Sequence, residues 1–136
     1  MCARIYHRRV PASRTLTRWL PVVLWAGVIF ALSSIPSLSS GLGTWDLVLR
    51  KLAHATEYAL LGFLLMRALL REAPALALGV AYAISDEVHQ AFVRGRHASP
   101  IDVAIDTAGL LVGVVAWRRF AAVEHDARAE AAGSGE

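Results

Sequence analysis

Ile-Ser-Asp-Glu-Val-His-Gln-Ala-Phe-Val-Arg-Gly-Arg, residues 84–96, places two acids, a histidine, a glutamine and two arginines at the end of an apolar run that begins at residue 75. In a soluble protein this density of ionisable groups is an ordinary solvated face. Here the flanking runs are long and apolar enough to be membrane spans, and an ionisable group at membrane depth is costly unless it is paired or faces a wet cavity. The stretch therefore marks both the end of a span and a candidate site.

The composition of the 136 residues indicates a small integral membrane protein. The chain is 56% hydrophobic and 18% charged, whereas about a quarter of the residues of a soluble domain are charged. The single cysteine, Cys2, excludes an internal disulfide and a cysteine-based metal site. The net charge of +3 does not indicate nucleic acid, because the arginines cluster beside apolar segments, where membrane topology explains them. We expect no nucleic-acid partner and no cofactor.

Four apolar segments predict an all-α integral membrane bundle of four transmembrane helices. The spans are expected at about 19–35, 47–70, 74–92 and 101–117, close to the ~20 residues that cross ~30 Å of hydrocarbon. The membrane domain then covers residues 19–119, between a basic cytoplasmic segment (1–18) and a polar tail (120–136) that extends the last helix and frays into disorder. A signal peptide is the less favoured interpretation of the N-terminus, because the whole chain is needed to make a domain.

The distribution of arginines predicts that both termini lie in the cytoplasm of a bacterial cell, with the chain crossing the inner membrane several times. Five arginines and no acid precede the first span, and more follow at 67, 71, 118 and 119. Arg50, Lys51, Arg94 and Arg96 oppose this orientation, because it places them outside. Because successive spans run in opposite directions, the start of the second span, the end of the third and the start of the fourth lie at the same depth in the membrane. With both termini in the cytoplasm, that depth is on the extracytoplasmic side.

The polar side chains of the spans gather at that level. Lys51, His54 and Tyr58 have the spacing of one helical face. The complete set is Lys51, His54, Glu57, Asp86, Glu87, His89, Gln90, Arg94, Arg96, Asp102 and Asp106. In the fourth span, Gly109 and Gly113 have the spacing of a small-residue packing surface. That surface serves either packing within the chain or a seam between copies, so a homo-oligomer is left open.

Three motifs in this set resemble the VanZ-like family of small bacterial membrane proteins. They are Lys51-x-x-His54-x-x-Glu57-Tyr58-x-x-Leu61-Gly62, then Ser85-Asp86-Glu87-x-His89-Gln90-x-Phe92-x-x-Gly95-Arg96, then Ser99-x-x-Asp102-x-x-x-Asp106-x-x-Gly109. The likeness covers about residues 25–113 and includes the Ser33-Ser34-Ile35-Pro36 loop. The resemblance implies the fold and a role in the cell envelope, because the family is named for a protein associated with resistance to glycopeptides, in particular teicoplanin. It assigns no catalytic residue.

The first functional interpretation is recognition of an anionic ligand at the extracytoplasmic face. Arginine holds phosphate or carboxylate with two parallel hydrogen bonds, and acids orient the arginines or accept hydrogen bonds from a sugar or amine. The residues expected to bind are Lys51, Glu87, Gln90, Arg94, Arg96 and Asp102. Membrane lipid, a lipid-linked cell-wall precursor and a glycopeptide all present such groups at this depth, so these are the expected partners.

The second interpretation is a membrane hydrolase or transferase that acts on a lipid phosphate or cell-wall precursor. A histidine and a carboxylate can serve as a base and its orienting partner, and the candidates are His54, Glu57, Asp86, His89 and Asp106. His54 and His89 with one of these carboxylates could also bind a divalent metal. The spacing is not diagnostic, because the third span holds a single histidine and no HExxH motif, so we assign no metal. A purely structural network that fixes helix register is the third interpretation. The absence of an inverted repeat disfavours a monomeric transporter.

Overall fold

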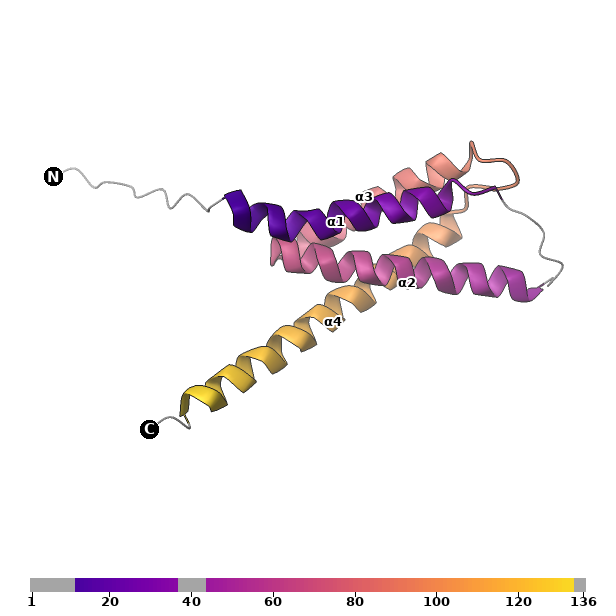
Figure 1. Cartoon of the computed structure of the whole chain (residues 1–136). Helices are drawn as coiled ribbons and strands as arrows, with labels where there is room; N and C mark the ends of the chain where they lie inside the picture. The colour runs from indigo at the N-terminus through magenta and orange to yellow at the C-terminus, as the bar shows by residue number, and fades with distance from the viewer. Residues whose placement is uncertain (1–11, 37–43, 134–136) are drawn as a thin grey trace.

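The computed structural model describes residues 12–36 and 44–133, which form four helices and no strand. The helices are α1 (Ala12–Ser33), α2 (Thr44–Leu69), α3 (Glu72–Gln90) and α4 (Pro100–Gly133). In Figure 1, α1, α2 and α3 lie alongside one another, and α4 crosses α2 and extends past the other three. The predicted all-α architecture with four helices is confirmed.

The helices differ from the predicted spans mainly at the two ends of the chain. Helix α1 begins at Ala12 rather than at residue 19, and α4 ends at Gly133 rather than at residue 117. Residues 120–133, the start of the segment predicted to extend the last helix and fray into disorder, are helical. Alanine, glutamate and arginine favour helix, and Arg128 pairs with Glu124 one turn earlier. Residues 1–11 and 134–136 of the predicted terminal segments lie outside the described residues.

Two of the helices are long and apolar enough to cross a membrane. They are the Thr15–Ser33 part of α1 and helix α4. Helices α2 and α3 fall short of the same hydropathy, because they carry most of the polar side chains of the predicted cluster. Large apolar side chains such as Val23, Phe30 and Val112 are exposed on the bundle, as expected for helices that contact lipid.

Helices α2 and α4 run in the same direction, and their backbones touch where they cross (Figure 1). A Cβ atom added to Gly109 would lie 2.4 Å from the Ala55 carbonyl oxygen, and one added to Gly113 would lie 1.9 Å from that of Ala59. On α2, a Cβ atom at Gly62 would lie 2.5 Å from the Leu110 carbonyl oxygen. The small-residue surface is thus used for packing within the chain.

Helix α1 is attached to this pair and to α3 by two hydrogen bonds from aromatic side chains. The Trp25 indole Nε1 donates to the Glu57 carbonyl of α2 at 2.8 Å, and the Tyr82 hydroxyl of α3 donates to the Ala26 carbonyl at 2.6 Å. Between the helices the largest fully buried apolar side chains among the described residues are Ile29, Tyr58, Leu61, Leu65 and Leu110. These contacts hold the end of α1 close to the polar ends of α2 and α3.

The glycine contact predicts a specific loss of stability. We expect Gly113→Ala to lower the free energy of unfolding by about 1–3 kcal/mol, because the added methyl group forces two backbones apart. Thermal unfolding of the detergent-purified protein measures the change. Gly27→Ala is the matched control, since no atom lies within 4 Å of its added Cβ, and alanine favours helix by up to ~1 kcal/mol. Equal unfolding midpoints for the two variants would contradict this packing.

Candidate functional site

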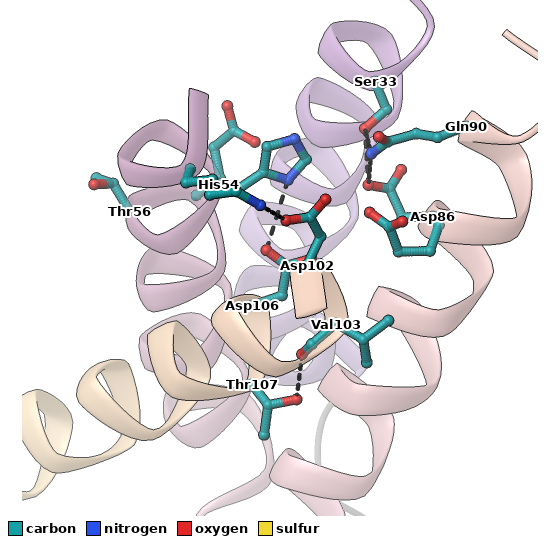
Figure 2. Close-up of polar contacts among 12 residues, drawn as sticks. Ser33, His54, Thr56, Asp86, Gln90, Asp102, Val103, Asp106 and Thr107 are labelled. Atoms are coloured by element: carbon teal, nitrogen blue, oxygen red, sulfur yellow. Dashed lines mark hydrogen bonds and ion pairs between the residues drawn. The ribbon is translucent and has the colours of Figure 1, made fainter. Parts of the chain in front are cut away.

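The polar cluster lies at the end of the bundle where α1 and α3 end and α2 and α4 begin. Figure 2 shows side chains of all four helices converging there, with hydrogen bonds and ion pairs between α1 and α3 and between α2 and α4. Residues far apart in the sequence become neighbours at this end: Ser33 contacts Asp86, and Lys51 contacts Asp102. Alternation of the helix directions therefore assembles one polar site from three distant motifs.

Asp86 is the centre of the contacts between α1 and α3. Its side chain is buried, and its Oδ2 atom accepts hydrogen bonds from Ser33 Oγ at 2.8 Å and from Gln90 Nε2 at 2.9 Å (Figure 2). The Oδ1 atom has no hydrogen-bond partner among the described residues. A buried carboxylate is costly unless it is hydrogen-bonded or paired. The hydrogen bonds from Ser33 and Gln90 therefore offset the cost of burying Asp86.

Arg96 joins the end of α1 to the same group of residues. Its Nη1 atom donates to Gln90 Oε1 at 3.2 Å, while Nε and Nη2 donate to the carbonyl oxygens of Ile35 and Leu32 at 3.1 and 3.2 Å. Carbonyl groups near the end of a helix lack intrahelical donors and accept such bonds readily. Gly95 has a φ of 77°, which favours glycine, and this turn directs Arg96 back towards α1.

Two charge pairs connect α2 to α4 at this end (Figure 2). Lys51 Nζ forms an ion pair with Asp102, and both side chains are about one-third exposed. One turn deeper, His54 Nδ1 lies 3.6 Å from Asp106 Oδ1, which is longer than a hydrogen bond. The Asp106 side chain is completely buried, so His54 stands between this carboxylate and solvent.

The remaining predicted site residues lie around these pairs. The buried Glu87 accepts a hydrogen bond from the Ser99 backbone N–H at 2.7 Å, just before α4 begins, where the helix dipole favours an anion. The His89 ring stacks against Phe30 at 4.4 Å, and its Nε2 atom lies 3.0 Å from Ser34 Oγ. Arg94 is exposed and lines neither of the clefts at this end.

Two adjoining clefts of about 320 Å³ each open at the polar end. Arg50, His54 and Arg96 line both of them. The first cleft also contains Ser33 and Glu57, and the second contains Lys51, Gln90 and Asp102. A pocket of this size accepts a small polar group or one end of a larger ligand. In the described ranges, no group of three or more His, Cys, Asp or Glu side chains is placed to hold a metal ion.

Three residues of this site were not among the predicted site residues. Ser33 and Ser99 complete the surroundings of Asp86 and Glu87, and Arg50 lines both clefts. Both serines belong to stretches that resemble the VanZ-like family, but no site role was predicted for them, because serines commonly close a span or precede a helix. Arg50 was read only for topology, although its position beside Lys51 placed it at the level of the site.

The fold and the site together define a small helical membrane protein whose polar groups meet at one end of the bundle. The chain belongs to the VanZ/LLP1 family, because the family model matches residues 8–121. This confirms the VanZ-like resemblance. Comparison with curated proteins and with solved structures finds no match.

Arg96 and Arg94 form a matched pair for testing the tie between α1 and α3. We expect Arg96→Ala to lower the free energy of unfolding by about 1–3 kcal/mol, because it removes three hydrogen bonds from a charged donor. Arg94→Ala removes the same charge from an exposed position and should change it by less than ~0.5 kcal/mol. Thermal unfolding in detergent compares the two. Equal losses of unfolding free energy in the two variants would show that positive charge, and not the hydrogen bonds of Arg96, stabilises this end of the bundle.

Proposed function

We propose that this VanZ-like membrane protein binds an anionic lipid-linked or glycopeptide-type ligand at the extracytoplasmic face of the bacterial cell membrane. Through this binding it affects tolerance to teicoplanin-like glycopeptides in the cell envelope. The observation that carries the proposal is the second cleft. Among its lining residues are Lys51, Gln90, Arg96 and Asp102, which are residues that the sequence assigned to ligand binding.

The chemistry of the cleft walls suits a phosphate or carboxylate attached to a polar, hydroxyl-bearing group. Arg96 uses one N–H on each of its three nitrogen atoms for protein acceptors, and a guanidinium has five. One N–H therefore remains on each Nη atom for a ligand, in an orientation fixed by the bonds already made. Asp102 and Gln90 supply an acceptor and an amide for hydroxyl or amine groups.

The arginine distribution supports the extracytoplasmic side for these clefts. The opposite end of the bundle carries Arg18, Arg67, Arg71, Arg118 and Arg119. The sequence has further arginines before residue 12. An excess of this kind marks the cytoplasmic flank, so both termini belong in the cytoplasm. The clefts then face the compartment where cell-wall precursors are polymerised and where glycopeptides arrive.

Arg50 provides the sharpest test of ligand binding. We expect purified protein to bind undecaprenyl phosphate in preference to undecaprenol, and Arg50→Gln to weaken that binding about tenfold or more, because a charge-assisted hydrogen bond is lost. Titration followed by intrinsic tryptophan fluorescence measures both affinities. Arg94→Gln is the control, since Arg94 lines neither cleft, and it should stay within about threefold of wild type.

Cell-based measurements complete this test. Expression in a susceptible host should raise the inhibitory concentration of teicoplanin, and Arg50→Gln should remove the increase. In the same cells, Cys2 should resist a membrane-impermeant maleimide, because the N-terminus is cytoplasmic. Equal affinity for undecaprenol and its phosphate would refute anion recognition, and labelling of Cys2 from outside would refute the proposed side.

The alternative function, a membrane hydrolase, is favoured by one specific observation. His54 lines both clefts with the buried Asp106 directly behind its ring, and Glu57 lines the first cleft beside it. In hydrolysis of a lipid phosphate, His54 would accept a proton from the water that attacks phosphorus. The bond between phosphorus and the lipid oxygen then breaks, and His54 returns its proton to that oxygen, giving a lipid alcohol and inorganic phosphate. Asp86 and His89 line neither cleft, so they are poorer candidates.

Turnover and binding separate the two functions. If the protein is a hydrolase, His54→Asn and Asp106→Asn should each reduce phosphate release from undecaprenyl phosphate or undecaprenyl diphosphate by about 100-fold or more, while binding is retained. His89→Asn should keep the wild-type rate, because His89 contacts Phe30 and Ser34 outside the clefts. A colorimetric phosphate assay on the purified protein decides this. Binding by wild-type protein without any phosphate release would leave only the binding function.

A further inference from the structure

A third cleft, of about 330 Å³, lies at the opposite end of the bundle. It is lined by Thr17, Arg18, Arg67, Leu70 and Trp117, which come from the start of α1, the end of α2 and the middle of α4. None of these residues lines the clefts at the polar end. The cleft is therefore a separate feature of the fold, and any ligand it holds is bound independently of the site described above.

The charge in this cleft is not balanced by an acid. Its lining contains two arginines and no carboxylate, and neither Arg18 nor Arg67 forms an ion pair with another described side chain. Glu72, at the start of α3 on the same end of the bundle, is already paired with Arg118 at 3.1 Å. Two guanidinium groups that share one cleft and lack an acidic partner have the chemistry that phosphate-type anions favour.

The position of the cleft identifies the source of that anion. Arg18 lies near the start of the apolar Thr15–Ser33 segment. The end of an apolar span is where the headgroups of a bilayer meet its hydrocarbon. Trp117 and Leu70 give the cleft an apolar wall, and tryptophan is favoured at this depth. At Trp19 begins an apolar groove of about 220 Å³, which runs along Val22 and Ala26 of α1 opposite Leu65 of α2. The basic cleft and the apolar groove are therefore lined by adjacent residues of α1, Arg18 and Trp19.

We propose that this cleft binds the phosphodiester headgroup of an anionic phospholipid, such as phosphatidylglycerol, in the leaflet on the side of the two termini. Basic pockets between membrane helices recognise lipid headgroups in this way. The bound lipid joins the start of α1 to the end of α2 and to α4 through the two arginines. It fixes the depth of the bundle in the membrane at the end away from the polar clefts.

Native mass spectrometry of the full-length protein tests the proposal with two lipids of identical acyl chains, phosphatidylglycerol and phosphatidylcholine. Wild-type protein should retain phosphatidylglycerol selectively. The double variant Arg18→Gln/Arg67→Gln should bind it about 30-fold more weakly, because each arginine near the headgroups contributes about a fivefold factor. The control Arg71→Gln/Arg128→Gln removes the same charge from residues outside the cleft and should stay within about threefold.

Further measurements keep the test decisive. Circular dichroism establishes whether the double Gln variant is folded. If it is unfolded, Arg18→Lys/Arg67→Lys tests the site instead, because it keeps both charges and should keep most of the selectivity for phosphatidylglycerol. Equal losses in the two Gln variants would overturn the cleft as a site and leave only general surface charge. Displacement of the lipid by soluble glycerol phosphate at similar concentration would overturn the lipid as ligand in favour of a free phosphate.

Discussion

The backbone contact between α2 and α4 is the constraint on which the rest of the structure depends. The carbonyls of Ala55 and Ala59 occupy the space that side chains at Gly109 and Gly113 would fill. This contact fixes the register of two parallel helices, and the register in turn places Lys51 beside Asp102 and His54 beside Asp106. Because buried polar pairs between membrane helices each contribute only about 0.6–2 kcal/mol, close packing rather than the pairs accounts for the register.

The three buried acids each connect a different pair of structural elements. Asp86 joins α3 to Ser33 of α1, Glu87 joins α3 to the start of α4, and Asp106 faces His54 of α2. A buried charge destabilises unless its partners are in place, so these acids disfavour other arrangements of the helices. Each of the three carboxylates therefore has a structural role in the bundle.

Hydropathy and alternation were enough to predict four helices and the level at which the polar side chains meet. The individual partners were not predictable, because Ser33 and Asp86 are brought together only by the packing of α1 on α3. Arg94 and Arg96 show best what the sequence could not predict. They stand two positions apart and look equivalent in sequence, yet the positive φ of Gly95 turns Arg96 onto α1 and leaves Arg94 exposed. The end of the extension of α4 was not predictable, because an alanine-rich polar segment suits both helix and disorder.

If both proposals hold, the two ends of the bundle select ligands by different physical means. At the polar end, Lys51 is paired with Asp102, and Arg96 is bonded to carbonyl oxygens and to Gln90. The proposed recognition there relies on directed hydrogen bonds, which salt screens little once they are buried. At the opposite end, Arg18 and Arg67 have no acid beside them in their cleft, and attraction there is mainly Coulombic and sensitive to salt. A ligand rich in hydroxyl and amide groups therefore suits the polar end, whereas a simple phosphodiester suits the other.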